Sequence, residues 1–418
     1  MVIKRYILKQ LIEHLRNTEI SLITGPRQAG KTTLMLELKK NLDRKGERTL
    51  FLSLDREIDK IFFESQVNLI ARIESEMGKR RGFVFLDEIQ RKENAGIYLK
   101  GIFDMNLPYK FIVSGSGSLE LKEKIHESLA GRRRVFELKT LSFEEFVNFK
   151  TEYKYEDRII NYLSIDTIST QQFLQEYLNY GGYPKVVLAE TLNEKFETIN
   201  EIFQSYLDKD ISYLLGIKKS KDFNNLVRLL ASQIGNLANL SEISNTLGIN
   251  VRTVKNYIYY LEKTFTLDEI LPFFRNIRSE ITKTPTYYFT DLGLRNMATR
   301  SFGQIELNQN IGFLFQNFVY RLLTDLPRSV FSRPRYWRTK HGSEIDFIIE
   351  KGLESVPVDV KYKQIKKPEL TRSMRSFIEK YSPKNAFVVN LFFEETIKIQ
   401  KTKVHFVPFY KAWAIWQS

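Results

Sequence analysis

The sequence has no cysteine and only four histidines among its 418 residues. Without cysteine there can be no disulfide framework, no thiol nucleophile and no cysteine-ligated zinc. The histidines are too scattered along the chain to indicate a histidine-based metal site; they are His14, His126, His341 and His405. Functions that depend on thiol chemistry are therefore excluded.

Long apolar runs are also missing. No stretch approaches the ~20 apolar residues that a membrane helix needs. The N-terminus lacks the apolar core of a signal peptide, and Leu8, Leu11, Ile12 and Leu15 have the spacing of an amphipathic helix instead. We therefore expect a cytoplasmic protein with no membrane partner.

The charge of the chain is strongly positive. Lys and Arg number 64 against 50 Asp and Glu, which gives a net charge of +14. Residues 301–418 hold 19 basic and 11 acidic side chains, so more than half of the excess lies in the last part of the chain. Excess positive charge favours polyanionic partners such as DNA, although a lysine-rich solubilising surface would give the same count.

Hydrophobic residues make up 43% of the chain, which is enough for folded cores, and the length suits two to four domains. Strand and helix patterns alternate up to about residue 150, which predicts a parallel sheet covered by helices. A helical, aromatic-rich part follows, then a compact unit of helices and a hairpin, then a helix with several strands. We predict an α/β fold class with four domains, at residues 1–150, 151–235, 236–300 and 301–418.

Residues 25–32 read Gly-Pro-Arg-Gln-Ala-Gly-Lys-Thr and lie between a short apolar strand and a helix. This is the P-loop pattern in its strand–turn–helix context. Glycines let backbone N–H groups curl around a β-phosphate, and the helix N-terminus adds partial positive charge. Lys31 can reach the β- and γ-phosphate oxygens, and the Thr32 hydroxyl can ligate Mg²⁺. The sequence therefore predicts an ATP and Mg²⁺ site formed by Gly25, Pro26, Arg27, Gln28, Ala29, Gly30, Lys31, Thr32 and Thr33.

A second apolar strand, residues 83–86, ends in Asp87 and Glu88. In open α/β sheets, ligands bind at the carboxyl edge of the strands, where these acids would lie. Asp87 is placed to hold Mg²⁺ through water, and Glu88 is placed to orient or deprotonate the attacking water. We therefore expect Asp87 to complete the magnesium site and Glu88 to be catalytic.

Two more positions are candidates for catalysis. The strand 111–114 ends in Ser114, followed by Gly-Ser-Gly-Ser, and a polar side chain there can reach the γ-phosphate or the attacking water. Arg132 lies in the run Gly-Arg-Arg-Arg and could stabilise transition-state charge in the site of a neighbouring subunit of a homo-oligomer. The alternative for Arg132 is a solvated surface charge.

In this order, the P-loop, the Leu-Asp-Glu strand end, Ser-Gly-Ser, Gly-Arg and the sequence Leu-Ser-Phe-Glu-Glu-Phe at 141–146 resemble a group of prokaryotic AAA-type ATPases. Members of this group join the ATPase to a helical lid, a winged helix and a C-terminal module of poorly known function. Gly-Gly-Tyr-Pro at 181–184 is similar to the Gly-Gly-x-Pro of the family. The resemblance implies that Pro184 packs against the nucleotide base; a simple tight turn is the alternative.

Residues 240–263 have the pattern of a helix-turn-helix. Ser241 is expected to cap the first helix and Gly248 to form the turn. On the second helix, Val254, Ile258 and Leu261 have the spacing of a face turned to the core.

The opposite face of the second helix carries side chains of the types that contact phosphates and base edges, namely Arg252, Thr253, Lys255 and Asn256. The hairpin that follows carries Arg275, Arg278 and Lys283, a candidate basic wing. We expect a winged helix that contacts DNA. The alternative is contact with a protein partner, because the same fold serves both purposes.

The tail carries Glu344 with Asp346, and Asp359 with Lys361. Residues two apart on a strand share a face, so each pair projects together. Two acids and an Asp-x-Lys are the parts of a Mg²⁺ nuclease site, and they resemble the restriction-endonuclease-like core written PD-(D/E)XK. Gln316 stands where many members have Glu, which removes one negative charge from a second metal site at Glu344, Asp346 and Asp359.

The sequence therefore predicts a Mg²⁺-dependent ATPase in which ATP binding and hydrolysis drive a conformational change, acting on DNA. One alternative is a nucleotide-gated signalling or scaffold switch with a protein partner. Another is an ATP-regulated nuclease, which the substitution at Gln316 disfavours because Mg²⁺ relies on carboxylate ligands.

Overall fold

The computed structural model describes residues 2–116, 128–205, 220–274, 284–307, 311–325, 333–339 and 342–416. The candidate wing residues Arg275, Arg278 and Lys283, and the end of the Gly-Ser-Gly-Ser sequence, lie outside these ranges. No helix of the described part is long and apolar enough to cross a membrane.

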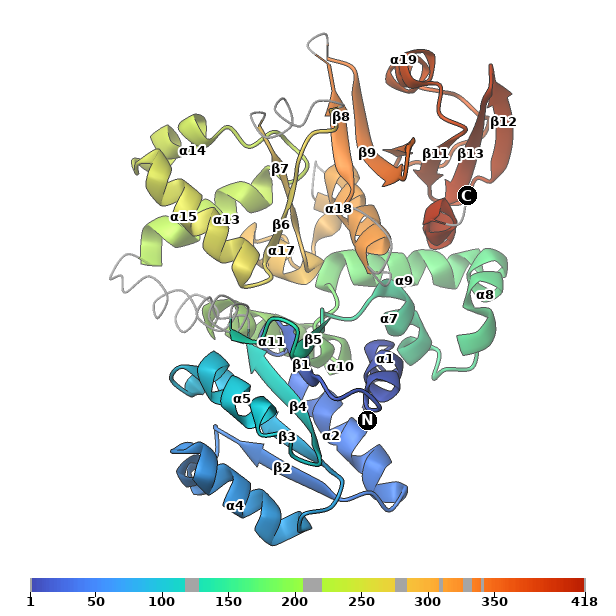
Figure 1. The fold of residues 1–418 in the computed structure, drawn as a ribbon. Coiled ribbons are helices and arrows are strands. Elements are labelled where there is room, and N and C mark those ends of the chain that lie inside the picture. Colours follow the sequence, from blue (N-terminus) through green and yellow to red (C-terminus); the bar gives the residue numbers. More distant parts are fainter. Residues whose placement is uncertain are drawn as a thin grey trace.

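The N-terminal part alternates strands with helices, as expected (Figure 1). Its strands are β1 (Ile20–Gly25), β2 (Thr49–Ser53), β3 (Gly82–Asp87), β4 (Tyr109–Ser116) and β5 (Arg133–Glu137). Its helices are α1 (Ile7–His14), α2 (Lys31–Arg44), α3 (Glu57–Lys60), α4 (Gln66–Met77) and α5 (Ala95–Asp104), with the short 3₁₀ helices η1 (Ile61–Phe63) and η2 (Ile89–Arg91).

The five strands form one parallel sheet in the order β2-β3-β4-β1-β5. Helices α1 and α2 share a core with one face of the sheet, and α4 and α5 share a core with the other. The strands β1, β3 and β4 are buried along their whole length, which explains their continuous apolar sequences. Their carboxyl ends meet at the edge that bears the P-loop. The expected α/β class with a parallel sheet is confirmed.

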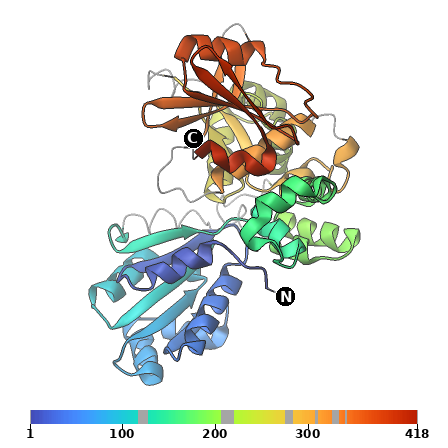
Figure 2. The same cartoon turned by 90° about the vertical axis from the view of Figure 1, so that its right-hand side faces the viewer.

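The helical part that follows consists of α7 (Phe143–Lys150), η3 (Glu156–Arg158), α8 (Ile159–Ile165), α9 (Thr167–Tyr180), α10 (Pro184–Leu188), α11 (Leu192–Ser205) and α13 (Ser220–Ser232). The sequence Leu-Ser-Phe-Glu-Glu-Phe begins α7 with a capping box: Ser142 accepts a hydrogen bond from the Glu145 N–H, and the Glu145 carboxylate accepts one from the Ser142 N–H. In Figures 1 and 2, α7, α8 and α9 lie between the N-terminal sheet and the C-terminal part.

The helix-turn-helix region contains α14 (Leu240–Leu247), α15 (Val251–Lys263), the antiparallel pair β6 (Leu267–Ile270) and β7 (Thr286–Phe289), and α17 (Leu292–Ala298). The tail contains η5 (Ile305–Leu307), α18 (Ile311–Thr324), β8 (Arg335–Arg338), β9 (Glu344–Lys351), β10 (Glu354–Val360), α19 (Arg372–Tyr381), β11 (Asn385–Asn390), β12 (Glu395–Ile399), β13 (Thr402–Pro408) and η6 (Phe409–Trp416).

The C-terminal strands form a six-stranded mixed sheet in the order β12-β13-β11-β10-β9-β8. One large core extends without interruption from α7, through the helical part and the helix-turn-helix region, to α18 and one face of this sheet. The domains predicted after residue 150 therefore share a core in the described part of the chain. Figure 2 shows the resulting two lobes, with the N-terminal sheet in the lower one.

Candidate functional site

The P-loop connects β1 to α2, and two of its glycines are required by geometry. Gly30 precedes α2 with φ of 97°, in the left-handed region that residues with a Cβ rarely adopt. A Cβ on Gly25 would lie 2.0 Å from the carbonyl oxygen of Leu138, which follows the neighbouring strand β5. The glycines of the motif therefore allow both the turn and the close approach of the adjacent strand.

Lys31 begins α2, and its side chain turns back into the loop. It is buried, with only 5% of its surface exposed, and its Nζ donates to the carbonyl oxygens of Gly25 at 3.1 Å and Pro26 at 2.9 Å. The ammonium is thus held on the inner side of the loop. An anion would be a stronger partner than these neutral carbonyls, because the attraction between opposite charges adds to the hydrogen bond.

The acids after β3 are joined to the P-loop helix and to β4. Thr32 Oγ1 donates to Asp87 Oδ2 at 3.0 Å, and the Ser114 hydroxyl donates to Asp87 Oδ1. The Ser114 Oγ in turn accepts from the N–H of Glu88 at 3.1 Å. The structure therefore brings together four predicted site residues from three adjacent elements.

Glu88 has an unusual backbone conformation for a non-glycine residue, with φ of 57°. Its carboxylate accepts a hydrogen bond from the Gln90 amide, whose oxygen accepts from the N–H of Ser116 at 3.1 Å. Burial raises the pKa of Glu88; the nearby Lys31 ammonium opposes this shift and the Asp87 carboxylate adds to it. A carboxylate with raised proton affinity, held at the end of the strand, is suited to accept a proton.

The structure does not place Arg132 in the P-loop site of its own chain. Its carbonyl oxygen accepts from the N–H of Ile20, so it lies beside the start of β1, whereas the P-loop follows the end of β1. The intervening five steps of strand span roughly 17 Å. Its guanidinium pairs with Asp104, at 2.7 Å between Nε and Oδ1. A role for Arg132 in catalysis therefore requires a second subunit.

Pro184 is brought beside the P-loop from far along the chain. It is the first residue of α10, after the turn at Gly181 and Gly182. A Cβ built on Gly30 would lie 4.0 Å from Pro184 Cγ, which is van der Waals contact. Pro184, which the resemblance predicts to pack against the nucleotide base, thus adjoins the loop.

Arg5 also adjoins the P-loop, and sequence reasoning missed it. Its guanidinium donates to the carbonyl oxygens of Ala29 at 3.0 Å and Lys139 at 2.7 Å, and it pairs with Glu145 at 3.1 Å. An arginine five residues from the start has no local pattern to mark it. Only the fold brings these three acceptors around one side chain.

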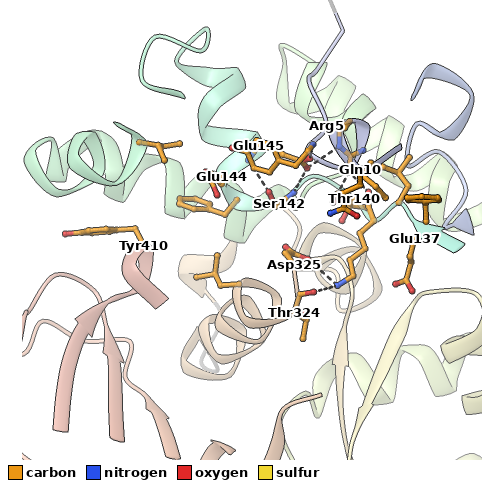
Figure 3. A pocket seen from close by; sticks show the side chains of 18 of the residues that line it. Arg5, Gln10, Glu137, Thr140, Ser142, Glu144, Glu145, Thr324, Asp325 and Tyr410 are labelled. Carbon is orange, nitrogen blue, oxygen red and sulfur yellow. Dashed lines mark hydrogen bonds and ion pairs between the residues drawn. The ribbon is translucent and has the colours of Figure 1, made fainter. Parts of the chain in front are cut away.

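Arg5 also lines a cavity of about 570 Å³ (Figure 3). Its walls come from the N-terminal segment, β5, α7, α8, α18 and η6. Lys139 crosses one side and donates to the Thr324 carbonyl oxygen at 2.8 Å. The cavity therefore marks the junction between the sheet domain and the C-terminal part.

In the helix-turn-helix region, one expectation was wrong. Asn239, not Ser241, caps α14, because the helix begins two residues earlier, at Leu240, and the Asn239 side chain accepts from the N–H groups of Ser241 and Glu242. Gly248 ends the helix in the left-handed conformation, as the turn requires. The predicted core face of α15 (Val254, Ile258 and Leu261) is buried.

The predicted DNA-contacting residues are divided by the structure. Arg252, Lys255 and Asn256 are exposed on α15. Thr253 is partly buried and donates its hydroxyl to the Asn250 side chain at 3.0 Å. The hydroxyl of Thr253 therefore takes part in capping the helix rather than pointing freely into solvent.

Glu262, near the end of α15, faces the strand pair of β6 and β7. Burial raises its pKa to about 7, and the carboxylates of Glu269 and Asp268 add to this shift while Arg333 opposes it. Since an unfolded chain has a glutamate pKa near 4.3, the folded state binds more protons between about pH 4.5 and 7. The stability that this group contributes is therefore lost as the pH rises through that window.

Replacing Glu262 by Gln should remove this loss. We expect Glu262→Gln to be more stable than the parent above pH 7 by on the order of 1 kcal/mol, after allowance for screening by solvent, and to differ little near pH 4.5. Urea unfolding at both pH values measures the difference. Glu242→Gln, on the exposed side of α14, is the matched control. Equal pH dependence in all three proteins would contradict the assignment.

In the C-terminal sheet, two of the three predicted acids, Asp346 and Asp359, come together. Asp346 is held by the Gln316 amide, at 2.7 Å between Nε2 and Oδ1, and by the Val360 N–H, at 2.6 Å from Oδ2. Asp359 accepts from Lys361 Nζ at 2.8 Å and from the Thr371 hydroxyl at 3.3 Å. Burial and the neighbouring Asp359 carboxylate raise the pKa of Asp346 well above its usual range.

Glu344 lies at the start of β9, and its side chain pairs with Arg338 at 3.7 Å rather than with the Asp346 and Asp359 cluster. Within the ranges that the structure describes, no group of three or more acidic or histidine side chains is arranged to hold a metal ion. A second magnesium site therefore stays a prediction.

Three family models match separate parts of the chain. Residues 17–147 match an AAA domain, residues 171–304 match a domain of unknown function (DUF8612), and residues 311–411 match another (DUF4143). Two solved structures of the replication initiator DnaA align with TM-scores of only 0.29 and 0.27. They are DnaA bound to AMPPCP and single-stranded DNA (16% identity, 63% of this chain and 90% of that one) and AMPPCP-bound DnaA from Aquifex aeolicus (17%, 62% and 86%).

Relatives resemble nearly the whole chain. An uncharacterised protein of Haemophilus influenzae is 24% identical over 95% of both chains. Uncharacterised proteins of Mycobacterium tuberculosis (25% identical, 90% of this chain and 77% of that one) and Methanocaldococcus jannaschii (26%, 83% and 75%) are also similar. Taken together, the sheet, the P-loop and the match at residues 17–147 show similarity to AAA-type P-loop ATPase domains, followed by two domains of unknown function.

Proposed function

We propose that this protein binds and hydrolyses ATP with Mg²⁺, and that its nucleotide state changes the contacts between the sheet domain and the C-terminal lobe. The observation that supports this most is the hydrogen-bonded group of Thr32, Asp87, Ser114 and Glu88 beside the P-loop. Two oxygen ligands of the kind that Mg²⁺ prefers, on Thr32 and Asp87, are 3.0 Å apart there. These residues fit the cation, whose positive charge would offset the negative charge of the phosphates.

Each residue then has a defined task. The N–H groups of the P-loop and the Lys31 ammonium bind the phosphates. Glu88 orients the attacking water and accepts its proton, and Ser114 fixes Asp87 and the backbone of Glu88 in relation to β4. Hydrolysis rests on this positioning, as in other phosphoryl transfers.

The route from the site to the other lobe passes through the turn at residues 181–184. Pro184 lies beside Gly30, and the N–H of Gly182 donates to the carboxylate of Asp291, which begins α17. A shift of the P-loop on nucleotide binding would thus move Pro184, and through Gly182 and Asp291 it would move the start of α17 in the C-terminal lobe.

We further propose that the conformational change acts on DNA, which the positive charge of the tail and the exposed Arg252, Lys255 and Asn256 favour. The alternative is a switch that acts on a protein partner. Comparing the ATPase rate with and without DNA tests the proposal: stimulation supports action on DNA, and an unchanged rate favours the protein-directed switch. Nuclease activity has less support, because Gln316 donates an N–H to Asp346 where a carboxylate would add a metal ligand.

If Arg132 acts in the site of a neighbouring subunit, two inactive variants should restore each other. Lys31→Ala supplies an intact Arg132, and Arg132→Ala supplies an intact P-loop. We expect mixtures of the two to hydrolyse ATP faster than either alone, which a phosphate-release assay measures. A mixture of Lys31→Ala with the double variant Lys31→Ala, Arg132→Ala is the control, because neither member has an intact P-loop and no recovery is expected. No recovery in co-assembled mixtures would refute the intersubunit role.

A further inference from the structure

A concentration of positive charge follows β10 and extends into the first turn of α19. Residues 361–375, here called the basic segment, contain six Lys and Arg and a single acid, Glu369. Lys363, Lys366, Lys367, Arg372 and Arg375 are exposed. A hollow of about 250 Å³ is lined largely by the segment, including four of its lysines.

The segment is fixed to the sheet at both ends. Lys361 pairs with Asp359 at 2.8 Å, and the Thr371 hydroxyl, which also caps α19, donates to the other oxygen of Asp359 at 3.3 Å. Although burial lowers it, the Asp359 and Asp346 carboxylates raise the pKa of Lys361 above its usual value. The backbone that carries the lysines is therefore held to the sheet through Asp359.

Most of this charge is not neutralised within the protein. Glu369 pairs with Lys367 at 2.9 Å. Among the described residues, the structure shows no ion pair for Lys363, Lys366, Arg372 or Arg375. Several exposed cations without an ion-pair partner, gathered in one segment, fit a polyanion with many charges better than a single small anion.

The acidic pair beneath the segment argues for binding without a metal ion. Each of the four carboxylate oxygens of Asp346 and Asp359 already accepts a hydrogen bond, from Gln316, Val360, Lys361 and Thr371. The donors that orient these acids belong to the protein itself. Phosphate groups would then be neutralised directly by lysine and arginine.

The other candidate surface is less suitable. The groove next to Lys255 on α15 is lined by Glu262 and Glu269, whose negative charge would oppose a phosphate backbone. The basic segment contains one acid for six cations, whereas the groove at α15 is lined by Lys255 together with these two acids. The comparison favours the basic segment.

We propose that residues 361–375 form a binding surface for the phosphodiester backbone of nucleic acid that needs no metal ion. Contacts of this type read charge and shape rather than base sequence, so binding should be independent of sequence and steeply dependent on salt. The inference extends the proposed action on DNA by naming the surface that DNA contacts.

The test uses the full chain and a fluorescent DNA of about 30 nucleotides, single-stranded or duplex, in EDTA without nucleotide. The triple variant Lys363→Glu, Lys366→Glu, Lys367→Glu should weaken binding at least tenfold and reduce the slope of log K against log salt by about two to three. The matched control is Lys398→Glu, Lys401→Glu, Lys403→Glu, three exposed lysines on and between β12 and β13 of the same sheet, with the same charge change.

Weakening in the first variant and not in the control supports the proposal. Equal weakening in both would show non-specific attraction and overturn it, as would binding that appears only with Mg²⁺. Loss of binding in Arg252→Glu, Lys255→Glu with the basic-segment variant unaffected would move the contact to α15. An acidic protein that binds the segment while DNA does not would also overturn it. ATP hydrolysis, measured separately, tests the proposed ATPase function independently.

Discussion

Replacing Glu88 by Gln is expected to leave ATP binding intact and to lower the hydrolysis rate by about 10²–10⁴-fold. The amide can still hydrogen bond to Gln90 and to water, but it cannot accept a proton. Because Asp87, Thr32 and Lys31 are unchanged, the contacts proposed for the phosphates remain. Binding of a fluorescent ATP analogue and release of phosphate measure the two effects separately.

Lys31→Ala should show the opposite pattern in binding, with loss of tight association as well as turnover, because the buried ammonium on the inner side of the loop is removed. Glu93→Gln, an exposed acid a few residues beyond Glu88, serves as the control and should hydrolyse ATP normally. Normal turnover in Glu88→Gln would refute its role. Loss of analogue binding in that variant would show that it supports the fold of the loop instead.

The parts of this site that the sequence predicts are those with a local cause. The P-loop pattern depends on glycines within one turn, and Asp87 and Glu88 follow directly from a buried strand whose end must meet the edge of a parallel sheet. Sequence adjacency therefore suffices to place them near one another. The same reasoning predicts Ser114, because β4 is the neighbour of β3.

Arg5, Gln90 and Asp291 could not be found in this way. Each acts through partners that the fold brings from elsewhere: the P-loop carbonyl of Ala29 for Arg5, and the N–H groups of Ser116 and Gly182 for the other two. No periodicity or spacing marks such a residue. The wrong prediction of Ser241 as the cap of α14 has a related cause. Asn and Ser are equally good caps, so the sequence alone does not tell which of Asn239 and Ser241 precedes the helix.

Asp291 offers a direct test of the proposed route, because it joins the turn at residues 181–184, next to the P-loop, to the start of α17. Its side chain is almost fully buried, at 2% exposure, and accepts from the N–H of Gly182 at 2.8 Å and from the N–H of Leu294 at 3.0 Å. The approach is too close for other side chains, since a Cβ on Gly293 would lie 2.1 Å from the Tyr180 carbonyl oxygen. The carboxylate thus replaces water for two backbone groups that have no access to solvent.

Asp291→Ala should therefore lower the free energy of unfolding by about 2–5 kcal/mol, because it leaves two buried N–H groups without an acceptor. Urea unfolding, followed by tryptophan fluorescence, measures this loss. Asp166→Ala is the matched control: Asp166 also caps a helix, by accepting from Ser169 at 3.0 Å, but outside the core, so its loss should cost clearly less than that of Asp291. Equal costs would show that Asp291 is only a helix cap. A larger cost at Asp291 would show that the bond to Gly182, two residues before Pro184 at the P-loop, contributes to holding the turn at residues 181–184 against α17.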